Sequence, residues 1–338
     1  MNSVLSDLLL LPFEKGGVLF PENEERILCW NTGVLGSLYS VHIIENYKYL
    51  DDSWLGKGIT RQTPDKLSQS YDLVLTHLPQ QKDYARFILA QSLQSLEDNG
   101  TLVAMAANDA GGKTIEKWFK ELGLQPTNLS KNKCRIVWAQ KQDVNQDRLD
   151  KYLQAGQQQK IKVGENEFVT QAGIYGWNKI DRGSKLLLEN ISNNLNGVGA
   201  DFGCGYGFLS QSVLNQYPNI EKLYSIDADY NALQCAKENL NSYNDKVTYQ
   251  WADITSPTFN LKNLDFIVMN PPFHQGKNTE NSIGKNFITK AHQSLKNKGW
   301  IYMVANAHLP YEKTLNALFI SVEKVIEVDG YKVFKAQK

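Results

Sequence analysis

Cysteine is scarce in this sequence, and no two cysteines have the C-x-x-C spacing that zinc sites commonly show. Small domains held together by disulfides are far richer in cysteine. We therefore expect no metal and no disulfide framework, and we expect reduced thiols with mostly structural roles. The four cysteines are Cys29, Cys134, Cys204 and Cys235.

Long apolar runs are also missing. The most apolar stretch near the beginning, residues 8–13, is short, follows Asp7 and has no basic flank. A signal peptide needs a basic start and a longer apolar run, and a membrane helix needs about 20 apolar residues. We expect neither a signal peptide nor a membrane span, and we expect a cytoplasmic protein.

An excess of either charge is the third absence. The 338 residues carry 36 Lys and Arg against 36 Asp and Glu, and the balance holds on both sides of residue 155. A protein that binds nucleic acid by charge alone is usually basic as a whole, so such a partner must be held by a local patch. A chain with 42% hydrophobic and 21% charged residues is globular, and its length suggests two domains of roughly 150 residues each.

The first half alternates short apolar strands with helical segments, the pattern of a βαβ domain with a parallel sheet. The pattern stops in a polar, glutamine-rich stretch over 142–162. The sequence thus predicts a domain over 1–145, a linker over 146–160 and a second domain over 161–338. Expected strands of the first domain are 26–30, 72–76, 101–105 and 134–139, and expected helices are 81–96 and 113–122.

The second half begins with an expected hairpin over 161–171 and then runs through β/α units. Near its end, Asp329-Gly330 lies between two β-like segments, a strong signal for a two-residue hairpin. A parallel sheet that ends in a reversed strand is typical of methyl-transferring relatives of the dinucleotide-binding fold. Expected strands are 198–202, 222–227, 247–251, 265–269 and 300–304, and expected helices are 182–193, 207–217, 229–241, 282–295 and 311–319.

The two halves also share a faint internal repeat. Three pairs of similar segments occur in the same order in both, which favours a duplication over chance. We expect the first copy to lack a cofactor site, because three chemically important positions differ. It has Cys29, Asn31 and His77 where the second copy has Asp201, Gly203 and Asn270.

The strongest local motif is D201-F-G-C-G-Y-G-F-L, at the junction of a strand and a helix. Glycines such as Gly203 and Gly205 let the backbone turn tightly and approach a ligand. The spacing differs from the G-x-G-x-x-G of nicotinamide-binding proteins, and Asp201 can accept from the α-ammonium group of an aminoacyl ligand. A plain glycine turn capped by an aspartate is the alternative.

Two further carboxylates lie at the end of an expected strand or just after one. Asp227 lies 22 residues beyond Gly205, where it can bind both hydroxyls of a ribose, although NAD-binding proteins share this spacing. Asp253 follows the next strand, where it can accept from an adenine amine or simply form a turn. These positions favour a nucleoside-containing ligand.

The most discriminating motif is N270-P-P-F273, directly after an expected strand. Two prolines fix φ, so the Asn270 side chain and the Pro271 carbonyl can be held as two acceptors for one amine. A planar amine is a poor nucleophile until both N–H groups are held and the nitrogen faces an electrophile. Phe273 offers a flat face on which a base can stack. The motif indicates chemistry on a planar amine.

With these motifs the second domain resembles the class I S-adenosylmethionine-dependent methyltransferases that carry N-P-P-F/Y. The whole chain, including G173-I-Y-G-W-N-K-I-D-R-G-S and V304-A-N-A-H-L-P-Y, resembles the small-subunit ribosomal RNA guanine-N2 methyltransferases. The resemblance implies two tandem Rossmann-like α/β domains, the second with a seven-stranded mixed sheet that ends in an antiparallel hairpin. It implies S-adenosyl-L-methionine as cofactor and a guanine N2 of 16S rRNA as the methylated atom, and a first domain that has lost cofactor binding.

The resemblance also implies roles for individual residues. The cofactor set contacts methionine, ribose and adenine, and the catalytic set holds the guanine. The segment 168–181 is expected to close over cofactor or substrate, without a choice of contact residues. The cofactor set is Asp201, Gly203, Gly205, Asp227 and Asp253, and the catalytic set is Asn270, Pro271 and Phe273.

Other functions remain open from the sequence. A guanine in 23S rRNA, an adenine N6 or a protein glutamine presents the same kind of amine. A noncatalytic RNA-binding protein of ribosome assembly is the alternative outside the enzymes. We expect a monomer whose partner is ribosomal RNA, in a small ribosomal subunit or an assembly intermediate.

Overall fold

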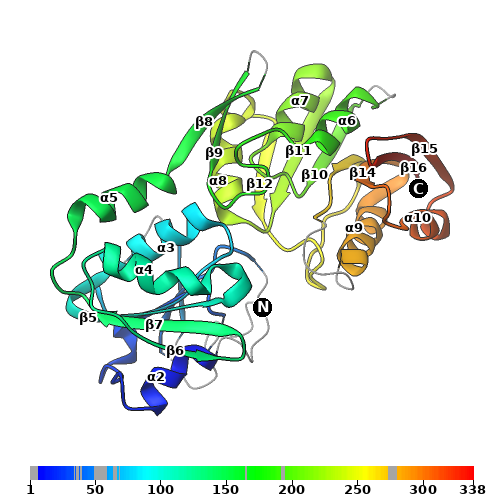
Figure 1. Ribbon diagram of the computed structural model, residues 1–338. Coiled ribbons are helices and arrows are strands. Elements are labelled where there is room, and N and C mark those ends of the chain that lie inside the picture. Colours follow the sequence, from blue (N-terminus) through cyan, green and yellow to red (C-terminus); the bar gives the residue numbers. More distant parts are fainter. Residues whose placement is uncertain are drawn as a thin grey trace. The chain divides into compact units, whose positions relative to one another are not determined.

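The computed structural model divides the chain into two compact units (Figure 1). The first unit comprises Met1–Asn46 and Leu50–Gln157, and the second comprises Tyr47–Tyr49 and Gln158–Lys338. None of the helices in the described part of the chain is long and apolar enough to span a membrane. The structure describes residues 7–33, 35, 38, 40–48, 59–63, 67, 69–163, 166–191, 195–272 and 280–338.

The first unit is built on a seven-stranded sheet in the order β3-β2-β1-β4-β5-β7-β6. The first five strands in this order are parallel, and β7 runs antiparallel to both β5 and β6. The strands are β1 (Ile27–Trp30), β2 (His42–Ile44), β3 (Thr60–Gln62), β4 (Tyr71–His77), β5 (Leu96–Ala107), β6 (Thr127–Lys131) and β7 (Cys134–Gln140). The helices are α2 (Leu11–Glu14), α3 (Lys82–Gln94), α4 (Ile115–Glu121) and α5 (Gln146–Ala155), with short 3₁₀ turns η1 (Asp7–Leu10), η2 (Glu24–Arg26), η4 (Asn108–Ala110) and η5 (Gly112–Thr114).

The second unit repeats this topology in the order β12-β11-β10-β13-β14-β16-β15, and here β16 runs antiparallel to both β14 and β15. A separate hairpin, β8 (Gln158–Val163) with β9 (Asn166–Gln171), precedes it. The strands are β10 (Gly197–Phe202), β11 (Ile220–Asp227), β12 (Val247–Trp251), β13 (Leu264–Met269), β14 (Leu295–Asn306), β15 (Ser321–Val328) and β16 (Tyr331–Gln337). The helices are α6 (Arg182–Glu189), α7 (Phe208–Gln216), α8 (Tyr230–Asn239), α9 (Glu280–Ser294) and α10 (Glu312–Leu318), with the 3₁₀ turn η6 (Asn241–Tyr243).

Matching contacts at corresponding positions support the predicted duplication. The Lys141 ammonium donates to the Leu96 carbonyl at 2.5 Å, and the Lys338 ammonium donates to the Leu295 carbonyl at 2.7 Å. In the first unit this bond joins the residue after β7 to the start of β5, and in the second unit it joins the residue after β16 to the start of β14. The shared strand order and the shared contact confirm two tandem α/β domains of one topology.

The parallel sheet predicted for the first domain is present over five strands, but the sequence did not predict that β7 runs antiparallel to both of its neighbours. The turn between them is Asn132-Lys133, with φ of 50° and 59°. The counterpart Asp329-Gly330 turn has φ of 52° and 80°. Both turns have left-handed backbone conformations. The sequence signal for such a hairpin is a glycine in the second position, and the first unit has Lys133 there instead.

Residues 146–160, the expected linker, contain helix α5 and the first residues of β8. The helix contacts α3 and buries Leu149 and Tyr152 in the first unit. Most of its other residues are polar, so the composition of this stretch suggested a linker. The contacts divide the chain between Gln157 and Gln158.

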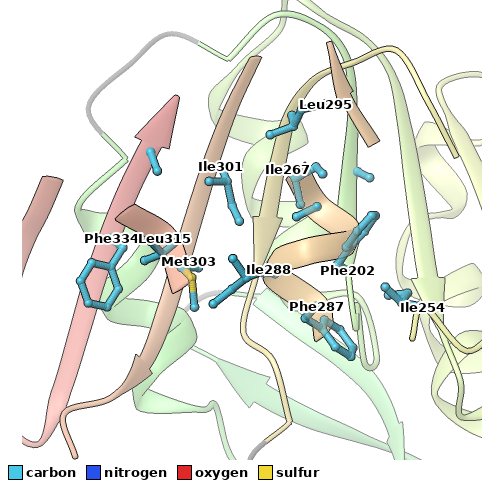
Figure 2. Packing of buried hydrophobic residues seen from close by; sticks show 14 of the residues in the cluster. Phe202, Ile254, Ile267, Phe287, Ile288, Leu295, Ile301, Met303, Leu315 and Phe334 are labelled. Atoms are coloured by element: carbon cyan, nitrogen blue, oxygen red, sulfur yellow. The ribbon is translucent and has the colours of Figure 1, made fainter. Parts of the chain in front are cut away.

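Apolar side chains cover both faces of the second unit's sheet. On one face, Ile267 of β13 and Met303 of β14 pack in a cluster with Ile288 of α9 (Figure 2). The alternate residues Phe266 and Val268 belong to a cluster on the other face, which α6, α7 and α8 cover. Such strands are apolar throughout, so a polar residue at a strand's carboxyl end is conspicuous.

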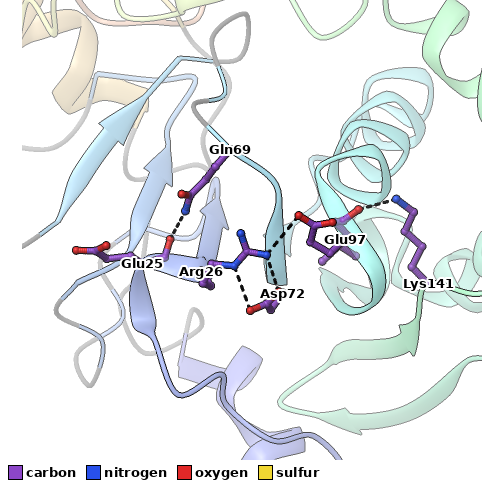
Figure 3. A network of polar contacts seen from close by, with 7 residues as sticks. Glu25, Arg26, Gln69, Asp72, Glu97 and Lys141 are labelled. Carbon is purple, nitrogen blue, oxygen red and sulfur yellow. Dashed lines mark hydrogen bonds and ion pairs between the residues drawn. The ribbon is translucent and has the colours of Figure 1, made fainter.

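Charged side chains join three strands of the first unit at the opposite, amino-terminal end of its sheet. Arg26, just before β1, donates to Asp72 of β4 at 2.7 Å and lies 3.4 Å from Glu97 of β5 (Figure 3). The Arg26 guanidinium holds the pKa of the Asp72 carboxyl below its ordinary value. These exposed groups hold the amino-terminal ends of the strands together. Ligand sites of α/β sheets form at the other, carboxyl ends.

Candidate active site

A cavity of about 460 Å³ lies at the carboxyl ends of strands in the second unit. Its walls come from the turn after β10, from the residues after β11, β12 and β13, and from the segment before α6. Open α/β sheets bind ligands at this edge. The predicted residues that line it are Gly203, Gly205, Asp227, Asp253, Asn270 and Pro271.

The glycine turn forms one wall. Gly203 and Gly205 have φ of 79° and 55°, in the left-handed region that side chains disfavour. A Cβ built on Gly205 would meet no atom within 4 Å, so a side chain there would project into free space beside the cavity. The Gly203 and Cys204 N–H groups both donate to the Ile226 carbonyl, which holds the turn against β11. The turn is therefore rigid and leaves room for a ligand.

Asp227, the last residue of β11, presents a carboxylate to the cavity. One of its oxygens accepts from the Gly205 N–H at 2.7 Å, and the other accepts from the Asp229 N–H at 2.8 Å. Burial raises the pKa of this carboxyl above its ordinary value, and the backbone donors oppose that shift. Each oxygen keeps a further lone pair, which suits two neighbouring hydroxyl groups.

Asp201 lies behind the glycine turn and is not among the cavity-lining residues. It is fully buried, and its Oδ2 accepts from the Ser210 hydroxyl at 2.7 Å. Its Oδ1 has no hydrogen-bond partner among the described residues. Burial raises the pKa of Asp201 to about 7, opposed by the Ser210 hydrogen bond and reinforced by the Asp227 charge. The structure therefore separates Asp201 from Asp227, which faces the cavity.

Asp253 follows β12 and closes an Asx turn. Its Oδ1 accepts from both the N–H and the hydroxyl of Thr255, at 2.8 and 2.7 Å. Its neighbours Ala252 and Ile254 line the cavity beside it. An apolar wall with one fixed carboxylate fits a flat heteroaromatic ring that carries an amine.

Asn270 follows β13, and its side-chain amide is held in one orientation. Its Nδ2 donates to Asp181 Oδ1 at 2.7 Å and to the Ser184 hydroxyl at 2.9 Å. A carboxylate only accepts, so the amide NH2 must face Asp181. The side-chain oxygen of Asn270, Oδ1, is left as an acceptor at the cavity wall. Pro271 and Pro272 line the cavity, whereas Phe273 lies outside the described residues.

Asp181 and Ser184 are site residues that sequence reasoning missed as such. Asp181 caps α6 by accepting from the Ser184 N–H at 2.9 Å, and its other oxygen accepts from the Tyr175 hydroxyl at 3.0 Å. An aspartate immediately before a helix is a capping signal, which predicts the helix rather than the site. Within the segment 168–181, the cavity-lining residues are Ile174, Tyr175, Gly176 and Asp181.

Tyr47 also lines the cavity, although it lies far from the other lining residues in the sequence. It forms an isolated β-bridge with Asp229, and the Lys48 N–H donates to the Ala228 carbonyl at 2.8 Å. The Lys48 ammonium lies 5.1 Å from the centre of the Trp251 ring. This short segment is part of the second unit and covers the wall formed by the residues after β11.

The first unit keeps the backbone of a similar turn. Gly33 has φ of 67°, and its N–H donates to the Glu45 carboxylate at 2.6 Å, as the Gly205 N–H does to Asp227. Glu45 is 5% exposed, and burial raises its pKa to about 7. His77 takes the position of Asn270, so the amine-binding group is the part that differs. Sequence comparison missed Glu45, because a glutamate after a three-residue strand has no motif.

Family comparisons match both units. A family model described as the methyltransferase small domain matches residues 165–335, and one described as its N-terminal domain matches residues 40–155. The fold and the site thus define a protein of the methyltransferase small domain class.

Curated relatives narrow this class. The chain is 30% identical over 292 residues to ribosomal RNA small subunit methyltransferase C of Aliivibrio fischeri, covering 84% of this chain and 81% of the relative. It is 29% identical over 273 residues to the protein of that name from Vibrio parahaemolyticus, covering 79% and 77%. The chain belongs to the ribosomal RNA small subunit methyltransferase C family.

A solved structure shows the same fold. It is described as the T. thermophilus 16S rRNA N2 G1207 methyltransferase, RsmC, in complex with AdoMet and guanosine. The match has a TM-score of 0.78 at 21% identity and covers 99% of this chain and 92% of that one.

Proposed function

We propose that this protein transfers a methyl group from S-adenosyl-L-methionine to the exocyclic N2 amine of a guanine in 16S rRNA. The observation that carries the proposal is the Asn270 amide, whose NH2 is fixed on Asp181 so that its oxygen can accept from a substrate amine. Relatives named for small-subunit rRNA methylation support RNA as the substrate. We further propose a cytoplasmic monomer that acts on a small ribosomal subunit or an assembly intermediate.

The cavity fits the cofactor. The glycine turn leaves open space at Gly205, the Asp227 carboxylate suits the ribose hydroxyls, and Asp253 suits the adenine amine. Asp201 lies behind the turn and does not line the cavity. Its carboxyl therefore acts on the cofactor's ammonium group through neighbouring groups and not by direct contact. The cofactor supplies a methyl group activated by a sulfonium.

In the proposed reaction the protein holds the amine and supplies no base. The Asn270 oxygen and the Pro271 carbonyl accept the two N–H groups of the guanine amine, which directs the nitrogen lone pair at the methyl carbon. A nitrogen–carbon bond forms as the carbon–sulfur bond breaks, and the nitrogen then loses one proton to solvent. Phe273 is the proposed stacking face for the base.

We propose that transfer occurs in the second unit alone. The first unit has a turn like that of the second, but there the buried Glu45 carboxylate accepts from the turn. His77 takes the place of the Asn270 amide. Without an amide oxygen and a following Pro-Pro, this unit lacks the two fixed acceptors. Its contribution is then structural or lies in RNA contact.

The test is to incubate the protein with labelled cofactor and, separately, small subunits, large subunits, free 16S rRNA and a release factor. We expect label in small-subunit RNA, as 2-methylguanosine by nucleoside mass spectrometry. Label in large-subunit RNA, in N6-methyladenosine or in protein glutamine would replace the proposed substrate. Failure to bind the cofactor would favour a noncatalytic assembly protein.

A further inference from the structure

We propose that the first unit carries an RNA-docking surface formed by η5, α4 and the tip of the β6–β7 hairpin. The proposal rests on the proposed function, which makes RNA the substrate, and it names the residues that grip the RNA away from the reacting base. We call it the lysine surface. It consists of Lys113, Lys117, Lys120, Lys131 and Lys133.

The charge of this region differs from that of its counterpart in the same chain. Residues 108–135 contain six basic and three acidic residues, a net charge of +3. The corresponding residues 307–332 contain three basic and four acidic residues, a net charge of −1. Both segments form the same helix and hairpin of one fold, so the fold itself does not require the positive charge. In a chain with zero net charge, this is the kind of local patch that a polyanion needs.

The lysines are available to a partner. Lys113, Lys131 and Lys133 are exposed, and none of them forms an ion pair within the described ranges. Lys117 and Lys120 pair with glutamates of their own helix, but their side chains remain 74% and 62% exposed. Exposed pairs of this kind are weak and can give way to a phosphate. In the counterpart segment, by contrast, Lys332 is buried against Glu312.

Hydrogen bonds hold the helix and the hairpin together as one rigid surface. Both η5 and α4 contact β7. Asn128 of β6 donates to Glu116 of α4 at 2.8 Å and accepts from Arg135 of β7 at 2.6 Å. At the tip, the Asn108 N–H donates to the Lys133 carbonyl at 2.8 Å. Prearranged charges lose less entropy when they bind.

Backbone conformation gives an independent argument at Lys133. Its φ of 59° lies in the left-handed region, which lysine seldom adopts. Gly330 takes the same place in the second unit with φ of 80°, and the Ala307 N–H donates to its carbonyl at 2.7 Å as Asn108 does to that of Lys133. The turn and its hydrogen bond therefore need no lysine side chain. A strained residue that the fold does not require indicates a function for its side chain.

The chemistry of the surface fits the RNA backbone rather than a protein partner. The exposed large apolar residues of the described chain all lie outside residues 108–135. Lysine ammonium groups contact phosphates as point charges and position an RNA without reading its sequence. Base selection is then left to the cavity of the second unit.

The test compares K131Q/K133Q with K313Q/K324Q, which removes two exposed lysines from the counterpart region. Binding of 16S rRNA is measured at several salt concentrations, with the cofactor dissociation constant as a control. We expect K131Q/K133Q to weaken RNA binding about five- to tenfold at 0.1 M salt and to reduce the slope of log K against log salt by about 1 to 2. K313Q/K324Q should stay within twofold of wild type.

A single variant separates folding from binding. K133G should melt at the same or a higher temperature than wild type, because glycine adopts the turn without strain, and yet bind RNA more weakly. Wild-type affinity and salt slope in both K133G and K131Q/K133Q would overturn the lysine surface, as would equal weakening by K313Q/K324Q. If the wild-type protein methylates no rRNA, the proposed function fails instead.

Discussion

Removing the Asp181 carboxylate should slow methyl transfer, because it releases the Asn270 amide from its fixed orientation. The affinity for the cofactor should stay nearly constant. In Asp181→Ala the Asn270 amide loses its 2.7 Å hydrogen bond and keeps the bond to Ser184. A hydroxyl both donates and accepts, so Ser184 alone does not fix which end of the amide faces the substrate. A hydrogen bond to a charged group contributes about 1.5–3 kcal/mol, which corresponds to about a 10- to 150-fold lower kcat.

Asp181→Asn is the matched control. Its side-chain oxygen can still accept from the Ser184 N–H and from Asn270, so the helix cap and the amide orientation are retained without the charge. The alanine variant also loses the cap of α6, at a cost of about 0.5–2 kcal/mol in unfolding free energy. Thermal melts of both variants therefore accompany the kinetics.

The assay is single-turnover transfer to small-subunit RNA together with calorimetric cofactor binding. We expect a large fall in rate for Asp181→Ala, a small one for Asp181→Asn and similar dissociation constants in both. A folded Asp181→Ala protein with wild-type turnover would refute the orienting role. Equal loss in both variants, with weaker cofactor binding, would show that the charge matters and the orientation does not.

Three further predictions concern the other site residues. Asn270→Ala should abolish transfer and leave the cofactor dissociation constant within about twofold, and normal turnover would contradict the proposed contact. Asp227→Ala should raise that constant by about 10- to 100-fold in calorimetry, because hydrogen bonds to a charged group are lost. Asp201 has a folded pKa of about 7 against an ordinary value of 3.8, so its share of stability is present below about pH 4 and is lost as pH rises to about 7. Relative to wild type, Asp201→Asn should gain up to about 4 kcal/mol in unfolding free energy over that range, and parallel pH profiles would contradict it.

How much the sequence predicts depends on whether a feature is local. The Asp329-Gly330 pair predicts the final hairpin of the second unit because two residues carry the signal. Asn132-Lys133 forms the same turn in the first unit without that signal, so the reversed strand there was missed. Strands β2 and β3 have three residues each, too few for a hydrophobic period to show.

The same distinction holds within the site. Asp227 and Asn270 are predictable because each lies at the carboxyl end of a strand, and such ends meet at one edge of a sheet. Asp181 acquires its role only through Asn270, 89 residues away, and no local pattern joins the two. Tyr47 is more distant still from the other cavity-lining residues, so only the fold brings it to them.

The most direct test of the central claim locates the transferred methyl group on the RNA. Small subunits are incubated with the cofactor and either wild-type protein or Asn270→Ala, and their 16S rRNA is digested to nucleosides for mass spectrometry. The proposed function predicts about one new 2-methylguanosine per 16S rRNA with wild type and none with the variant. A methyl group on any other atom, or equal yields from both proteins, would contradict it.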